Sequence, residues 1–253
     1  TIMSGLLIGI LFSRTVSGFV GAHFGWRSMY WVASLLMILL CFTLFFLLPE
    51  DKNNFKGTYK SLMFSLIPLI KEQYYLKTAA LTGALLFGSF TAFWTTLIFL
   101  LEDAPFHYNS QAAGLFGVVG VAGALAAPLV GRLADKKSPL FTIGFGIKAS
   151  VLAYLIFFFS SHSVIGLIIG ILILDIGVQS THISNQSLIY SLVPEARSRL
   201  NTVYMFSYFV GGASGSALGA YAWSIDKWQG VCYVGLVFTI LALMVHTIFN
   251  KIK

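Results

Sequence analysis

The sequence predicts an all-α membrane protein that crosses the bilayer several times. Of its 253 residues, 57% are hydrophobic and only 10% are charged, whereas soluble proteins carry roughly 25% charged residues. Eight apolar runs are each long enough, at about 20 residues, to cross a bilayer as a helix. The runs are also far longer than the roughly ten-residue strands of a membrane barrel, so helices are favoured.

The eight expected spans fall into two groups separated by a long polar connection. Two spans precede residues 49–77 and six follow them. Within that connection, Leu62, Leu66 and Leu69 alternate with lysines at roughly helical spacing, which predicts an amphipathic helix over 59–76 on the cytoplasmic face. The expected spans are 2–24, 28–48, 78–101, 112–130, 139–159, 164–188, 202–223 and 230–249.

Lysine and arginine are unevenly distributed between the two predicted sides of the membrane. Twelve lie in alternate connections or at the C-terminus, and only Arg27 and Lys227 lie in the opposite connections. This bias marks cytoplasmic loops, so both chain ends are expected in the cytoplasm. The net charge of +7 is therefore explained by topology rather than by a nucleic-acid surface. The twelve residues are Lys52, Lys56, Lys60, Lys71, Lys77, Arg132, Lys136, Lys137, Arg197, Arg199, Lys251 and Lys253.

Two pairs of spans show a sequence repeat. Residues 25–33 match residues 227–235 at an offset of 202, and the Ser- and Gly-rich stretch 13–21 aligns with 211–219 at an offset of 198. A parallel repeat of about 200 residues is typical of transporters built from two six-helix halves. The small residues of 211–219 also allow helices to approach closely. The alternative is convergent placement of Gly and Trp in apolar sequence.

A short charged turn, GRLADKK at residues 131–137, lies between two apolar runs. Gly131 permits a tight turn. Asp135 has two candidate partners: the positive N-terminal end of the span at 202–223, or the guanidinium groups of Arg197 and Arg199. The other interpretation is a solvated loop whose charges only follow the topology. The residues that we assign to this gate motif are Gly131, Arg132, Asp135, Lys136, Arg197 and Arg199.

The charged turn and the stretch VPEARSRLN at 193–201 carry a resemblance to a known family. GRLADKK resembles the loop motif G-x-L-A-D-[RK]-x-[GS] between helices eight and nine of the major facilitator superfamily, and 193–201 resembles the loop that opens helix eleven. The chain thus resembles helices five to twelve of the transporters in a bacterial drug-transporter-like branch of this superfamily. The resemblance implies a cytoplasmic latch at the gate motif, which breaks when two helical bundles rock.

This resemblance divides the chain into three parts. Residues 1–48 would be the last two helices of an N-terminal bundle, 49–77 the cytoplasmic linker, and 78–253 a six-helix C-terminal bundle. The expected fold class is a major facilitator helical bundle in the bacterial inner membrane, with eight transmembrane helices of an expected twelve. The remaining N-terminal helices of the same protein would then be partners of this chain.

Polar residues inside an expected span are candidates for function, because ionisable groups are costly at bilayer depth. Asp175, Gln179, His182 and Gln186 recur at the spacing of one helix face. A carboxyl at that depth favours its neutral form, which would let Asp175 take up and release protons. His182 could relay protons or bind substrate. The alternative is a polar stripe satisfied by neighbouring helices, with Asp175 paired to Lys148.

Two further residues belong to the expected substrate or proton pathway. Arg14 lies near the middle of the first span, where an arginine should face the protein interior or a cavity. It could bind an anionic substrate group or pair with an acid outside this chain. Trp94, with Phe90 and Phe93, could form an aromatic wall for an amphipathic substrate, although lipid-facing aromatic packing is a comparable interpretation.

These observations favour a secondary transporter that works by alternating access, with proton coupling through Asp175. Its direction of transport, export or import, stays open at this point. The alternative is a non-transporting membrane scaffold or an inactive remnant of a transporter. The sequence shows no phosphate-binding glycine loop, metal-ligand cluster or nucleophile triad, so we expect neither an enzyme nor a cofactor. The expected partners are the lipid bilayer, a small-molecule substrate and protons.

Overall fold

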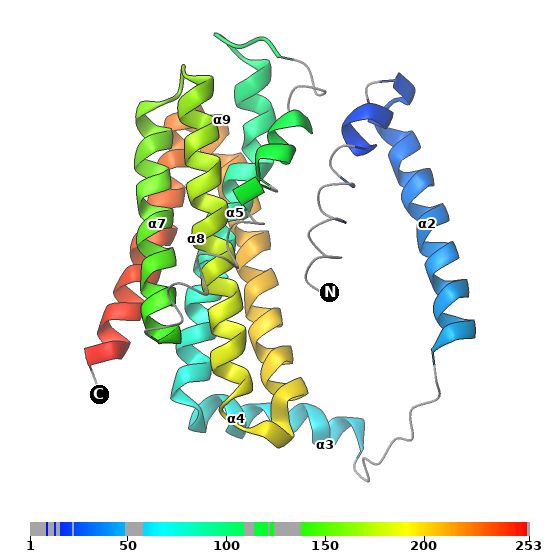
Figure 1. Ribbon diagram of the computed structural model, residues 1–253, viewed down its shortest axis with the longest axis vertical. Helices are drawn as coiled ribbons and strands as arrows, with labels where there is room; N and C mark the ends of the chain where they lie inside the picture. The colour runs from blue at the N-terminus through cyan, green and yellow to red at the C-terminus, as the bar shows by residue number, and fades with distance from the viewer. Residues whose placement is uncertain are drawn as a thin grey trace.

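The computed structural model of the chain describes residues 9, 13, 16–21, 23–48, 58–108, 114–120, 122–123 and 138–251. Every regular element in these ranges is helical. Five of the helices are long and apolar enough to cross a membrane. Figure 1 shows most of them side by side, with their axes roughly parallel. Most of the expected span 112–130, all of the turn 131–137 and much of the span 2–24 lie outside the described residues.

Helix α2 (Trp26–Leu47) corresponds to the expected span 28–48. It begins after Gly25, whose φ of 79° is a conformation that glycine adopts without strain. None of its residues is buried, and Figure 1 shows it standing apart from the main bundle. Its exposed surface is apolar almost throughout, as expected for a helix that faces lipid or other membrane helices.

The linker forms two short helices, not the one continuous helix predicted over 59–76. Helix α3 (Tyr59–Phe64) is followed by Ser65, which lies between it and α4 (Leu66–Glu72). The break has a local cause, because Pro68 has no N–H to donate to the carbonyl of Phe64. Figure 1 shows both helices lying across one end of the bundle, as an amphipathic helix on a membrane surface would.

The three following helices that the structure describes agree with the expected spans. Helix α5 (Tyr74–Glu102) begins four residues before the predicted 78 because Gln73 is extended and starts a new helix. Helix α7 (Pro139–Phe159) has the predicted bounds, and α8 (Val164–Tyr190) ends two residues late. Serine caps fix both starts, since Ser138 accepts from the N–H of Phe141 and Ser163 from that of Gly166.

Helix α9 (Arg197–Lys251) contains the last two expected spans. It follows the short 3-10 helix η1 (Pro194–Ala196) and is interrupted at Asp226 and Lys227, whose backbone angles are not helical. Lys227 has a φ of 48°. The first half, 197–225, and the second half, 228–251, therefore form an antiparallel pair, as Figure 1 shows.

Glycines in the first half of α9 place it directly against α5. A Cβ on Gly215 would overlap the carbonyl of Gly88, and one on Gly211 would overlap the backbone of Ala84. At Gly219 the nearest atom, Cα of Ala92, would be 2.9 Å from such a Cβ. This row of small residues allows the close backbone approach that stabilises helix pairs in lipid, as the sequence predicted for 211–219.

Candidate functional site

The polar face predicted on α8 lies on one continuous helix. Asp175 is only 3% exposed, whereas Gln179, His182 and Gln186 are half-buried. The face therefore runs from a buried carboxyl group to polar groups that are partly accessible from one side of the bundle. The hydrogen bonds and packing of these side chains decide what chemistry the face can support.

Asp175 faces two glycines of the expected span 112–130, Gly120 and Gly123. A Cβ on Gly123 would lie 2.8 Å from Cβ of Asp175, and one on Gly120 would lie 3.4 Å from its Oδ2. The same Cβ on Gly120 would lie 2.7 Å from Cζ2 of Trp94. Two glycines thus make room for the carboxyl group, and the indole and carboxyl converge on Gly120. Neither glycine is among the predicted site residues, although their three-residue spacing on a predicted span was a usable signal.

His182 is held by two tyrosines from α9. Its Nδ1 lies 3.0 Å from the hydroxyl of Tyr204, in a hydrogen bond whose direction depends on the tautomer. The ring centroid of Tyr208 is 4.7 Å from that of the imidazole. Tyr204 is fully buried and Tyr208 is 7% exposed. These tyrosines are not among the predicted site residues, because nothing local in 197–208 indicates which helix they face.

A buried amide extends this polar network. Asn185 donates from Nδ2 to Oγ1 of Thr82 at 3.3 Å and to the carbonyl of Ala79 at 3.4 Å. Its Oδ1 is buried and accepts no hydrogen bond from the described residues. An unsatisfied buried acceptor costs about 1–3 kcal/mol, so this oxygen is a candidate ligand for a water molecule or a transported solute.

The other two members of the α8 face and Trp94 contribute softer contacts. Gln186 Nε2 lies 4.0 Å from the sulfur of Met205, and Gln179 is half-buried. Trp94 is half-buried and packs edge-on against Phe93, with centroids 5.4 Å apart. Phe93 is fully buried in the apolar core, so only part of the expected aromatic wall is accessible.

The two arginines of the gate motif that the structure describes, Arg197 and Arg199, have local partners. Arg197 donates from Nε to the carbonyl of Tyr190 at 3.1 Å. Arg199 donates from Nη1 to Oγ of Ser65 in the linker at 3.2 Å. The rest of the gate motif and Arg14 lie outside the described residues. The residues concerned are Gly131, Arg132, Asp135, Lys136 and Arg14.

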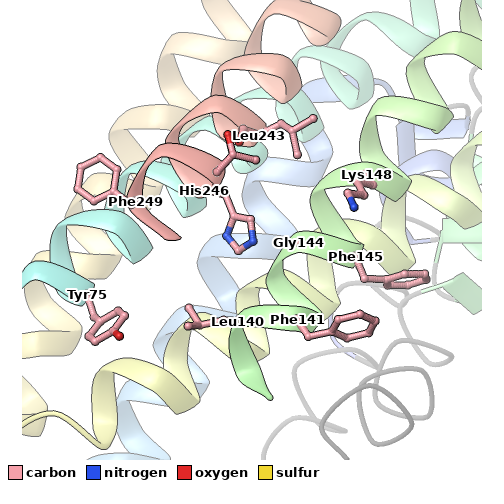
Figure 2. Close-up of a pocket in the computed structure, with 10 residues that line it drawn as sticks. Tyr75, Leu140, Phe141, Gly144, Phe145, Lys148, Leu243, His246 and Phe249 are labelled. Atoms are coloured by element: carbon pink, nitrogen blue, oxygen red, sulfur yellow. Dashed lines mark hydrogen bonds between the residues drawn. The ribbon is translucent and has the colours of Figure 1, made fainter. Parts of the chain in front are cut away.

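Lys148 lies away from the polar face of α8. It lines a pocket of about 620 Å³ together with His246 of α9 and Tyr75 of α5 (Figure 2). The face of α7 that contacts α8 is instead formed by Gly146 and Ser150. A direct pair between Lys148 and Asp175 is therefore not the arrangement in this structure.

At the opposite end of the bundle from the linker, an ion pair joins two turns. Nζ of Lys227 lies 3.3 Å from Oδ2 of Asp103. Asp103 also accepts from the backbone N–H of Ala104 at 2.9 Å. The Ala104 hydrogen bond first, and then the Lys227 ammonium, hold the pKa of Asp103 below its usual value. Both side chains are exposed, so the pair contributes little to stability.

The fold and this site define a class of protein. Apolar helices surround a buried carboxyl, an imidazole and amides, and no cluster suited to a metal ion occurs among the described side chains. Polar groups arranged in this way inside a helical bundle are characteristic of polytopic membrane proteins that handle solutes or ions. A family model described as Major Facilitator Superfamily matches residues 1–216. The chain belongs to this superfamily.

Curated relatives cover almost the whole chain. A protein of Escherichia coli O157:H7 named "Uncharacterized transporter YgaY" is 45% identical over 97% of this chain and 62% of its own length. One of Streptomyces coelicolor, "Probable transporter SCO4007", is 28% identical over 95% of the chain and 56% of its length. A "Probable sugar efflux transporter" of Helicobacter pylori is 26% identical over 95% and 59%. The chain thus spans about three-fifths of the length of these relatives.

Proposed function

We propose that the protein is a secondary transporter of a small molecule that works by alternating access. The observation that carries this proposal is the polar face of α8, which places Asp175 and His182 within a bundle of mostly apolar helices. Membership of the superfamily and the names of the relatives support it. In this reading residues 1–48 close an N-terminal bundle, 49–77 link the halves, and 78–253 form the C-terminal bundle.

Asp175 is the group that we assign to proton coupling. Its carboxyl group is buried inside the bundle, where it and the indole of Trp94 converge on Gly120. Opening of the bundle to either side of the membrane would let the carboxylate accept a proton from one side and release it to the other. Such intramembrane carboxylates are the usual elements of proton relays in transporters.

The substrate would contact the accessible part of the face, beyond Asp175. Gln179, His182 and Gln186 offer amide and imidazole groups, and Trp94 offers an aromatic surface. This set suits a neutral or polar solute better than a strongly charged one, because hydrogen bonds rather than fixed charges dominate. Export is the direction that we propose, since a relative is named as a sugar efflux transporter.

The gate motif would act at the end of the bundle that carries the linker. We propose that Gly131, Arg132, Asp135 and Lys136 form the turn of a cytoplasmic latch, with Arg197 or Arg199 as the partner of Asp135. The hydrogen bond between Arg199 and Ser65 connects this region to the linker between the two halves. Both chain ends would lie in the cytoplasm of a bacterial inner membrane.

The scaffold alternative predicts no solute movement at all, so reconstitution of the full-length protein separates the two functions. Proteoliposomes with an internal pH-sensitive dye are exposed to a solute panel that includes mono- and disaccharides. A transporter gives solute-dependent proton movement, and Asp175→Asn should abolish the coupling. Asp103→Asn is the matched control, because its carboxyl lies outside the bundle. Unchanged coupling in Asp175→Asn would remove Asp175 from the mechanism, and no movement of any solute would favour the scaffold.

A further inference from the structure

A pocket of about 620 Å³ lies on the bundle at the end next to the linker. It is formed by the start of α5, the first half of α7 and the end of α9, as Figure 2 shows. Its walls are mostly aromatic and aliphatic. The lining residues are Tyr75, Leu140, Phe141, Gly144, Phe145, Lys148, Leu243, His246, Thr247 and Phe249.

The pocket opens away from the candidate transport site. On α7, Gly146 contacts α8, and Lys148, two residues further on, points to the nearly opposite side of the helix. Phe141 and Phe145 on that side are 46% and 41% exposed. Figure 1 places α7 and the end of α9 on the side of the bundle remote from α2. In a membrane, lipid is what lies against such a surface.

Lys148 gives this surface a fixed positive charge. It is the only charged residue of α7 and is exposed on the pocket wall. Among the described residues that line the pocket, none carries a carboxylate that would neutralise it. His246 reaches from α9 toward Gly144, where a Cβ would lie 2.7 Å from its Nε2. The pocket therefore combines one cation, an imidazole and apolar walls, which suits an anionic amphiphile.

The position of the pocket along the membrane normal fits a lipid headgroup. Tyr75 and Leu140 lie in the first turns of their helices, so one end of the pocket is at the membrane interface. Lys148 lies nine residues after the start of α7, about 14 Å along the helix axis. Lysine side chains at such depths extend back toward the interface, which brings the ammonium group toward an entering phosphate.

We propose that this pocket binds the headgroup of an anionic phospholipid from the leaflet next to the linker, with Lys148 as its main contact. Basic pockets between membrane helices bind such headgroups in other proteins. The rings of Phe141 and Phe145, which lie nearer the start of α7 than Lys148 does, border the path by which the headgroup enters the pocket. This site is independent of the transport function proposed above, because it uses neither the α8 face nor the gate motif.

Lipid binding to the full-length protein in detergent can be counted by native mass spectrometry. Phosphatidylglycerol and the zwitterionic phosphatidylcholine are titrated separately against wild type, Lys148→Gln, Lys148→Arg and Lys60→Gln. Lys60 is the matched control, because it is exposed on α3 in the same leaflet but outside the pocket. Wild type should bind phosphatidylglycerol more tightly than phosphatidylcholine.

Lys148→Gln should lose about fivefold in phosphatidylglycerol affinity, the effect of one lysine near an anionic lipid. Lys148→Arg and Lys60→Gln should retain the preference. Equal loss in Lys148→Gln and Lys60→Gln would show surface attraction only and overturn the proposal. If Lys148→Gln does not fold, a second measurement on the wild type replaces it: acylation of lysines by an amine-reactive reagent, followed by mass spectrometry. Phosphatidylglycerol should slow acylation of Lys148 more than phosphatidylcholine does and should leave Lys60 unchanged. Absence of this protection, or of any preference for phosphatidylglycerol in the wild type, refutes the site.

Discussion

Replacing Gly215 with alanine should weaken the contact between α5 and the first half of α9. A Cβ at this position overlaps the carbonyl of Gly88. Because the obstacle is backbone, the overlap is relieved only by separating the helices. Overpacking of this kind costs about 1–3 kcal/mol, and the better helix propensity of alanine returns up to about 1 kcal/mol. A clash with backbone puts the cost in the upper part of that range, about 2–3 kcal/mol. The expected net loss is then about 1–2 kcal/mol, which lowers the ratio of folded to unfolded protein by about 5- to 30-fold.

The assay is equilibrium unfolding of the full-length protein in mixed micelles, followed by tryptophan fluorescence. Ser214→Ala is the matched control: it places alanine one residue away on the exposed face, where only the local hydrogen bond to the carbonyl of Val210 is lost. Gly215→Ala should unfold at a clearly lower denaturant fraction than the control. If it proved as stable as Ser214→Ala, the close contact would not exist, and the placement of Tyr204 beside His182 would lose its support.

Two further outcomes follow from side-chain contacts. Tyr204→Phe removes the hydroxyl that bonds His182 and should cost about 0.6–1.7 kcal/mol in the same unfolding assay; no change would mean that the bond does not form. Asp103→Asn should lower the melting temperature slightly at neutral pH. The pKa of Asp103 is held below 3.8 by the Ala104 N–H and by Lys227, so its contribution is present above about pH 4 and disappears as pH falls through the folded-state pKa. A difference between wild type and variant that persists in strong acid would contradict this assignment.

The helix spans were predictable from sequence because apolar length and serine caps are local signals. Pro139 after Ser138 defines the start of α7, and the predicted and observed bounds coincide. The sequence predicted one linker helix because its leucines recur at regular helical spacing. The helix breaks nevertheless, since Pro68 has no N–H to donate. Local patterns predict where a helix begins, but they give less information about where a short one breaks.

The polar face of α8 was also predictable from a local signal, because its members share one helix and recur at helical spacing. Their partners on other helices were not predictable from the sequence. Tyr204 is 22 residues from His182, and Gly120 is more distant still from Asp175, so these contacts depend on how the helices rotate about their axes. The position of Lys148 on the outer face also depends on this rotation, which the nearly uniform hydrophobicity of α7 does not specify.

Alternating access itself is tested most directly by paired distance measurements between spin labels in the full-length protein. Cys41 and Cys232 are first replaced by serine and alanine, because Cys41 is exposed and would be labelled. One label pair joins position 47 at the end of α2 to position 191 after α8, and the other joins 26 to 161 at the opposite ends. Lowering the pH in the presence of a transported solute should lengthen one distance while it shortens the other. Two distances that stay constant, or that change in the same direction, would contradict the proposed mechanism.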